Sequence, residues 1–232
     1  MTIAVIGATG NTGRAVVKKL RALGQNPVCV IRNGEKASEV LGADAKTAVA
    51  ELSDRPTLEK ALADVQSVFV VTGHNPGMVE QQTNVLEAAF KAGVQYLVRV
   101  SGARTAAKAE SESMVGRGHA ASNERLKASG IRWVILSPSM FMQNMLGQAL
   151  SIKTESKIVL PFAKNLPVTP IDVRDAGAVG ARILIDPAPH AGKTYDLTGK
   201  SRPTAPSPRC SQACWAVRSL MLPSRPRRLS RP

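Results

Sequence analysis

The chain has 232 residues, of which 44% are hydrophobic and 21% charged, and its formal net charge is +14. This length suits one α/β domain, and the apolar content is sufficient for a buried core. No apolar run approaches the roughly 20 residues of a membrane helix, and the first residues enter a folded pattern directly rather than forming a secretory signal. We therefore expect a cytoplasmic protein without a membrane segment. The three cysteines fit neither metal-ligand nor disulfide spacing, so no metal site is expected.

Short apolar runs alternate with helical patterns as far as residue 200. The predicted strands are 3–6, 27–31, 47–50, 67–71, 96–100 and 133–136, and the predicted helices are 12–24, 35–41, 56–63, 78–92 and 119–129. Strands that are apolar throughout are typical of a parallel sheet covered on both faces. The sequence thus predicts an α/β protein with a Rossmann-type, doubly wound parallel sheet over residues 1–137.

The rhythm changes after residue 137. Residues 138–200 predict a turn into a helix, then a short strand, a helix cap and another helix, and we interpret them as part of a small substrate-side subdomain. Residues 201–232 carry seven arginines, six prolines and no acidic residue, which is typical of disorder. Without this segment, 24 basic residues face 17 acidic ones.

A glycine-rich turn follows the first predicted strand. Gly7, Gly10 and Gly13 in "GATGNTG" form G-x-x-G-x-x-G between a strand and a helix. Glycine lets the backbone turn tightly and approach a pyrophosphate, which the first N–H groups of the helix attract. The side chains of Thr9, Asn11 and Thr12 are candidate additional donors. This pattern predicts a dinucleotide site.

The end of the second predicted strand predicts the preferred cofactor. Proteins selective for NAD commonly place an acidic residue here, on the ribose 2′-hydroxyl. This chain instead has Arg32, with Lys36 one helical turn later. Cations at this point would pair with a 2′-phosphate, so NADP(H) is expected over NAD(H); a solvated arginine on a loop is the alternative.

Several separated motifs together resemble one family. They include "GATGNTG", "VIRNGEKA", "VFVVTG", "NVLEAAFKAGVQYLVRVSGA", "GHAASNERLKASGIRWVILSPSMFMQN" and "IDVRDAGAVGARIL". Between residue 2 and about residue 199 the chain resembles the atypical short-chain dehydrogenases/reductases of the NmrA-like branch, which includes NAD(P)H:quinone reductases and triphenylmethane-dye reductases. The resemblance implies a small-molecule acceptor and leaves the oligomeric state open.

The resemblance also implies roles for individual residues. Glu51 and Leu52 are implied to flank the adenine of the cofactor. Those implied to line the cofactor path towards the nicotinamide are Thr72, Gly73, Ser101 and Gly102, and Pro138 and Met140 are implied to bind the cofactor as well. Phe141 and Asn144 are implied to form the wall towards the substrate. For the apolar residues of the segment after Pro138, packing in the core is the alternative.

His119 is the candidate for an accessory proton donor, and a helix-start histidine bonded to backbone is the alternative. It matches a histidine of the family's H-x-x-x-E pattern, but Asn123 replaces the glutamate. The Tyr-x-x-x-Lys dyad of the main short-chain dehydrogenase group is missing, because Val100 and Gly199 stand four residues after the two tyrosines. Asp172 and Asp175 are not read as a catalytic pair; we expect Asp175 to be a helix cap or first-turn residue.

Two functions remain open from the sequence. One is an NAD(P)H-dependent oxidoreductase that transfers hydride to a quinone-like or other electron-poor acceptor, which needs little acid–base help. The other is a non-catalytic NAD(P)-binding regulator of the NmrA type.

The ending from residue 201 departs from the family. A basic arm for nucleic acid is the ordinary interpretation of clustered arginines. However, codons that encode "CWAVRSLM" can, read in the shifted frame, encode Leu-Gly-Arg-Pro-Val-Thr-Tyr, which fits the family at this point. We therefore predict a frameshift near Lys200, and nucleic-acid binding is not expected.

Overall fold

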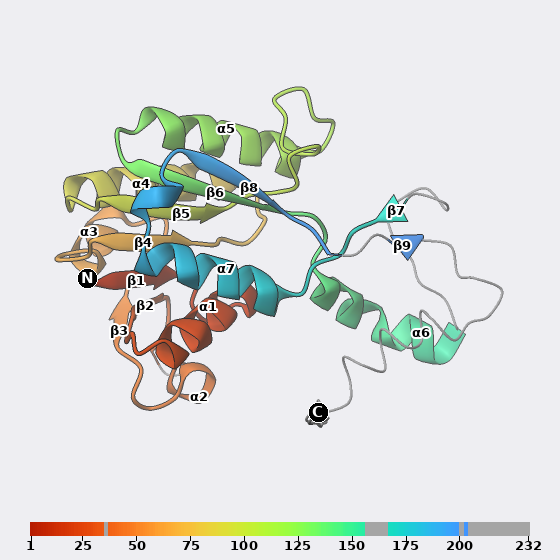
Figure 1. The fold of residues 1–232 in the computed structure, drawn as a ribbon, viewed down its shortest axis with the longest axis horizontal. Helices are drawn as coiled ribbons and strands as arrows, with labels where there is room; N and C mark the ends of the chain where they lie inside the picture. The colour runs from red at the N-terminus through yellow and green to blue at the C-terminus, as the bar shows by residue number, and fades with distance from the viewer. Residues whose placement is uncertain (35–36, 156–166, 200–201, 204–232) are drawn as a thin grey trace, which may run out of the picture.

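The structure is a computed structural model that describes residues 1–34, 37–155, 167–199 and 202–203. Within these ranges, seven parallel strands form one sheet in the order β3-β2-β1-β4-β5-β6-β8 (Figure 1). The strands are β1 (Ile3–Ile6), β2 (Val28–Ile31), β3 (Thr47–Val49), β4 (Ser67–Val70), β5 (Tyr96–Val100), β6 (Arg132–Pro138) and β8 (Lys193–Leu197). The order reverses direction between β1 and β4, as in a Rossmann-type sheet.

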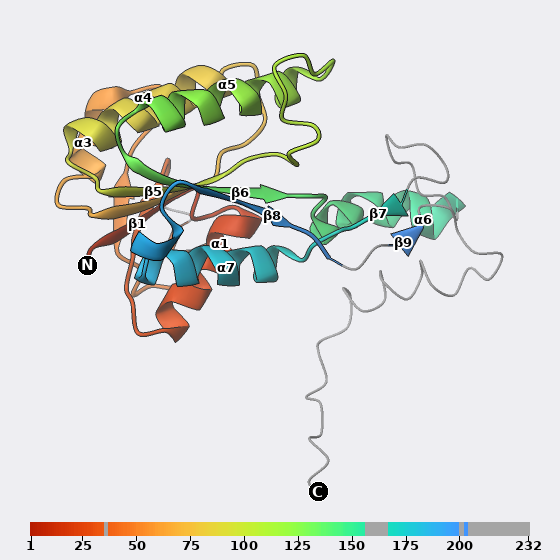
Figure 2. The same ribbon diagram turned by 45° about the horizontal axis from the view of Figure 1, so that its top comes forward.

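Helices cover both faces of the sheet (Figures 1 and 2). One face carries α1 (Asn11–Ala22), α2 (Ala37–Leu41) and α7 (Val173–Ile185), and the other carries α3 (Arg55–Ala61), α4 (Met78–Lys91) and α5 (Met114–Ala128). Alternate residues of β1 serve the two layers: Ile3 and Val5 pack in the first core, Ala4 and Ile6 in the second. This double coverage explains why the central strands are apolar almost throughout.

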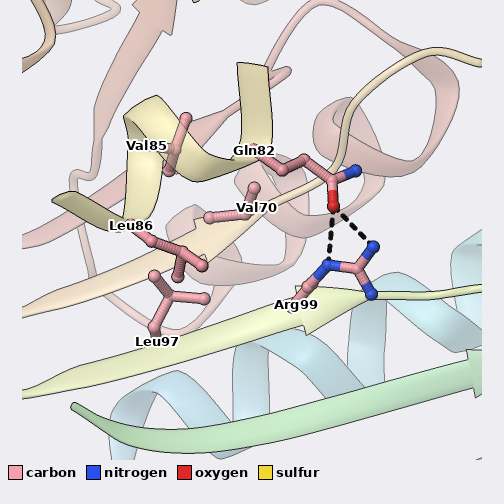
Figure 3. A pocket seen from close by; sticks show the side chains of 6 residues that line it. All are labelled: Val70, Gln82, Val85, Leu86, Leu97 and Arg99. Carbon is pink, nitrogen blue, oxygen red and sulfur yellow. Dashed lines mark hydrogen bonds between the residues drawn. The ribbon is translucent and has the colours of Figure 1, made fainter. Parts of the chain in front are cut away.

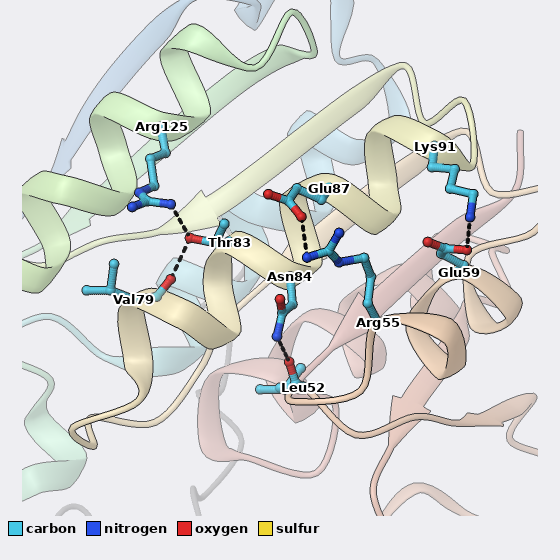
Figure 4. A network of polar contacts seen from close by, with 9 residues as sticks. All are labelled: Leu52, Arg55, Glu59, Val79, Thr83, Asn84, Glu87, Lys91 and Arg125. Carbon is cyan, nitrogen blue, oxygen red and sulfur yellow. Dashed lines mark hydrogen bonds and ion pairs between the residues drawn. The ribbon is translucent and has the colours of Figure 1, made fainter.

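Close packing joins the helices within each layer. A Cβ atom on Gly177 of α7 would lie 2.6 Å from Cβ of Ala15 in α1, so glycine lets the two helices approach. On the other face, ion pairs join α3 to α4: Arg55 to Glu87 and Lys91 to Glu59, each at 2.6 Å (Figure 4). Through α7, a segment late in the sequence therefore packs against the first helix of the chain, α1.

The segment after β6 leaves the sheet and then comes back to it. The 3₁₀ helix η1 (Met142–Gln148) and α6 (Ala149–Glu155) extend beyond the carboxyl ends of β6 and β8 (Figures 1 and 2). Beside them, β7 (Pro167–Val168) pairs antiparallel with β9 (Arg202–Pro203). The chain then forms α7, a short 3₁₀ turn η2 (Ala188–His190) and β8, which pairs parallel with β6.

The structure confirms the predicted sheet and its two helical layers, with two differences. It adds β8, which the sequence pattern did not predict as a strand, and it starts α5 at Met114 rather than at His119. The Ser113 hydroxyl caps α5 by accepting from the Gly116 N–H at 3.4 Å. In the described part of the chain no helix is long and apolar enough to cross a membrane, and no cluster of three metal-ligating side chains forms. The predicted disorder and frameshift concern residues that, apart from 202–203, lie outside the described ranges.

Candidate cofactor and acceptor site

The glycine loop lies between β1 and α1 and has no room for side chains at two positions. Gly7 has φ +80°, and a Cβ there would overlap the Val71 carbonyl oxygen. A Cβ on Gly13 would overlap the carbonyl of Gly7. The Gly10 N–H closes the turn by donating to the Gly7 carbonyl at 3.0 Å. The loop is thus fixed by backbone contacts that only glycine allows.

The amino end of α1 is exposed to solvent where the helix follows this loop. Gly10 is its N-cap residue, no side chain caps it, and its first turn has no acidic residue. Thr9, Gly10 and Asn11 are exposed, whereas Thr12 is buried; the Asn11 side chain accepts from Arg14 at 2.8 Å. Uncapped N–H groups and the positive end of the helix dipole are what a pyrophosphate requires. The loop and helix therefore fit a dinucleotide.

The predicted adenosine-side residues follow β2 and β3. Arg32 is exposed directly after β2, and Lys36 lies outside the described residues. Leu52 is held in place because the Asn84 amide of α4 donates to its carbonyl at 3.0 Å (Figure 4). The Glu51 N–H donates to the Thr57 hydroxyl at 3.1 Å. Thus Arg32, Glu51 and Leu52 all follow the carboxyl ends of adjacent strands, at the edge where such sheets bind ligands.

The ends of β4 and β5 carry the next four predicted residues. Thr72 follows β4, and its hydroxyl accepts from the Gln82 amide of α4 at 2.6 Å. Ser101 follows β5, and its hydroxyl accepts from the Asn123 amide of α5 at 3.0 Å. Gly73 is exposed, with nothing near its Cβ position. Gly102 lies against the His119 ring, because a Cβ atom added at Gly102 would be only 2.8 Å from the Cδ2 atom of that ring. The structure therefore brings His119 next to a predicted cofactor-path residue.

His119 lies in the second turn of α5, is 5% exposed, and is held by side chains rather than by backbone. Its Nδ1 is 3.1 Å from Nη2 of Arg99, and its Nε2 is 3.2 Å from Nε2 of exposed His74. Because a guanidinium only donates, Nδ1 accepts and Nε2 carries the proton towards His74. Burial, the charge of Arg99 and then His74 lower the pKa of His119 to about 3. At neutral pH this imidazole is uncharged.

Arg99 is the residue that sequence interpretation missed. It is 2% exposed on β5 and points towards α4, where Nε and Nη2 donate to the Gln82 amide oxygen at 2.9 and 2.5 Å (Figure 3). Nη1 donates to the amide oxygen of Asn123. A single arginine within the apolar run "YLVRV" was the available signal. Its amide partners could not be seen because they come from two different helices.

The predicted substrate-side residues lie after β6. Pro138, the last residue of β6, is buried, and the Met140 carbonyl accepts from the Ile171 N–H at 2.8 Å. Phe141 is half-buried against the core, in a bridge with Ile171, and Asn144 is exposed. Backbone contacts with Ile171 therefore hold the first residues of this segment in place beyond the carboxyl end of β6.

The segment is also attached to the start of α7. Asp172 is the N-cap of α7, and its carboxylate accepts from the Arg174 N–H at 2.8 Å and from the Gln143 amide at 3.0 Å. The Gln143 oxygen accepts in turn from the Val173 N–H at 3.0 Å. Burial raises the pKa of Asp172, but the hydrogen bonds from Arg174 and Gln143 outweigh it and lower the pKa overall. Asp175 lies in the first turn of α7, as expected.

Comparisons with known proteins agree with this geometry. Residues 7–179 match the NAD(P)H-binding family. The NAD(P)H azoreductase of Xenophilus azovorans is 32% identical over 197 residues, which cover 85% of this chain and 68% of that protein. Quinone oxidoreductase 2 of Escherichia coli (strain K12) is 28% identical over 204 residues, covering 86% and 69%.

A solved structure shares the fold. The Citrobacter sp. triphenylmethane reductase complexed with NADP(H) superposes with a TM-score of 0.77 at 24% identity, covering 88% of this chain and 72% of that one. The sheet order, the glycine loop and the family match lead to one conclusion: the chain belongs to the NAD(P)H-binding family, in its NmrA-like branch of atypical short-chain dehydrogenases/reductases.

Proposed function

We propose that this protein is an NAD(P)H-dependent reductase that transfers hydride to a quinone-like or other electron-poor small molecule, and that it prefers NADPH. The observation that carries the proposal is the glycine loop, which presents an uncapped helix N-terminus at the carboxyl edge of the sheet. The relatives named an azoreductase and a quinone oxidoreductase support the reaction class.

The chain's own groups supply binding and orientation. Backbone N–H groups of the loop, with Thr9, Asn11 and Thr12, would hold the pyrophosphate, and Arg32 would pair with the 2′-phosphate of NADPH. The residues after β4 and β5 would support the nicotinamide side. The bound cofactor supplies the hydride; the protein's part is to hold the acceptor beside it and exclude water.

Little acid–base machinery is required of this site. An acceptor that is already electron-poor delocalises the charge it gains, so the missing Tyr-x-x-x-Lys dyad does not prevent reduction. His119 is neutral, and both of its ring nitrogens are engaged in hydrogen bonds. Its role is therefore to hold neighbouring polar side chains in place rather than to donate a proton to the acceptor. Phe141 and Asn144 would form the acceptor wall.

The test combines binding and turnover. Titration with NADPH gives the Kd, and the loss of NADPH absorbance with a panel of quinones gives the rate. We expect NADPH binding and quinone-dependent oxidation. Binding without oxidation of NADPH by any quinone would reject the reductase and leave the non-catalytic regulator, and no binding would reject both.

A further inference from the structure

The buried cation of Arg99 has only neutral hydrogen-bond partners. The guanidinium is bonded to the amides of Gln82 and Asn123 and to the uncharged ring of His119. Burial lowers the pKa of Arg99 to about 10, which leaves the side chain protonated at neutral pH. The positive charge is therefore solvated by dipoles but is not neutralised by them.

No counter-charge stands beside Arg99 in the part of the chain that the structure describes. None of the ion pairs found there involves it. The cavity next to it, between β5 and α4, has a volume of only about 10 Å³ and is otherwise lined mainly by apolar side chains (Figure 3). That volume is about one water molecule, too small for sulfate or phosphate. An unpaired buried charge is costly, so its retention calls for a functional reason.

The hydrogen bonds of Arg99 lead to the candidate site. Gln82 connects it to the hydroxyl of Thr72, at the end of β4, and Asn123 connects it to the hydroxyl of Ser101, at the end of β5. His119 connects it to His74, which is exposed. A single intervening side chain thus connects the Arg99 guanidinium to each of three residues at the carboxyl edge of the sheet: Thr72, Ser101 and His74. At that range, and in an environment of low dielectric constant, its field acts on whatever binds above.

We propose that Arg99 makes this site select its acceptors by charge: neutral and anionic acceptors, such as quinones and sulfonated quinones or dyes, are favoured over cationic dyes. This inference rests on the proposed reductase function. A quinone that accepts a hydride, with its electron pair, from NAD(P)H becomes a hydroquinone monoanion and then takes a proton from water. A cationic dye becomes neutral in the same step.

The three kinds of acceptor (neutral, cationic and sulfonated) should differ in which kinetic constant responds. The positive field stabilises the negative charge that develops on a quinone, so for neutral quinones it raises kcat. It opposes the binding of a cation, so for a cationic dye it raises KM. For a sulfonated acceptor it lowers KM.

Asn123 offers a matched pair of variants. Asn123→Glu places a carboxylate against Arg99 and neutralises it, whereas Asn123→Gln has the same length and shape without the charge. The acceptors are naphthoquinone, a naphthoquinone sulfonate and a cationic triphenylmethane dye. Relative to Asn123→Gln, we expect Asn123→Glu to lower kcat/KM for both quinones about tenfold and to lower KM for the cationic dye by a similar factor. Thermal unfolding of both variants checks that they fold.

Equilibrium binding of the sulfonate and of the cationic dye to the protein without cofactor gives a readout independent of turnover. Weaker binding of the sulfonate and tighter binding of the cationic dye by Asn123→Glu would support charge selection, whether or not any acceptor is reduced. A complete lack of reduction would reject the proposed reductase function but not the charge selection. Equal affinities and equal kinetic constants in the two variants would overturn the role of Arg99.

Discussion

The carbonyl of Gly7 occupies the place that a Cβ atom on Gly13 would need. This single relationship ties the end of β1 to the first turn of α1 and leaves the helix N-terminus uncapped in front of the loop. Any side chain at residue 13 must push the loop and the helix apart.

Gly13→Ala should therefore weaken NADPH binding about tenfold or more, because the loop amides lose their common orientation. Isothermal titration measures the Kd. The control is Gly177→Ala, which also introduces a close contact but at the α1–α7 interface, 2.6 Å from Ala15. It should cost about 1–3 kcal/mol of stability and leave the Kd unchanged. If both variants lose binding equally, general destabilisation explains the effect.

Arg32→Glu should reverse the cofactor preference. A carboxylate after β2 repels a 2′-phosphate and accepts from a 2′-hydroxyl, so NADPH should bind about tenfold more weakly and NADH more tightly. The ratio of the two dissociation constants is the measurement. Arg182→Glu, in the last turn of α7, changes the net charge equally and should not move the ratio. A ratio that stays the same in Arg32→Glu would reject this arginine as the selector.

The burial of His119 should make the fold sensitive to acid. Its folded pKa of about 3 lies below the ordinary 6.5, so between these values the unfolded chain binds a proton that the folded chain does not. This contribution to stability is complete above pH 6.5 and is lost as the pH falls towards 3, with a slope of up to about 1.4 kcal/mol per pH unit. Urea unfolding at several pH values measures the slope. His119→Asn should reduce it, and an unchanged slope would contradict the assignment.

Asp172→Ala should affect both α7 and the segment after β6, which carries the proposed acceptor-wall residues Phe141 and Asn144. Loss of an N-cap costs about 1 kcal/mol, and Gln143 loses the carboxylate that it donates to. We therefore expect a lower Tm and a higher KM for the acceptor, with little change in the Kd of NADPH. Because the pKa of Asp172 is lowered in the fold, the same stabilisation is lost in the wild type as the pH falls through that pKa. Asp175→Ala, an exposed change in the same turn, should leave the KM unaffected.

The frameshift near Lys200 is tested by sequencing the coding DNA across codons 195–225. We expect a continuous alternative frame that encodes a family-like helix in place of the proline- and arginine-rich ending. An alternative frame that is soon interrupted by stop codons would make the ending a genuine part of the protein.

The sequence predicts most of the sheet because the first six strands are mainly apolar and are separated by helices with clear stops. It misses β8 because "KTYDL" is an edge strand in which only Leu197 is buried, so the segment lacks an apolar run. It also places the start of α5 five residues late, since the two glycines in "MVGRG" hide the first turns. Local pattern is strong only where both faces of a segment are buried.

The site, too, has one part that local sequence predicts and another part that it does not. The glycine loop and the strand ends follow from local sequence and from the rule that parallel sheets bind ligands at their carboxyl edge. The Arg99 network does not, because Gln82, Asn123 and His119 meet it only after α4 and α5 have packed on β5. His74, in the loop after β4, belongs to the same network through His119.

The late return of the chain to the sheet also determines the order in which the fold can be completed. α7 packs on α1, and β8 pairs with β6 at the edge of the sheet, so these contacts can be made only after most of the chain has been synthesised. During synthesis the first six strands would emerge well before α7, the helix that packs on one face of β4 and β5. Leu197 ends the last strand of the sheet, three residues before Lys200. A frameshift near Lys200 would therefore leave every strand of the seven-stranded sheet encoded.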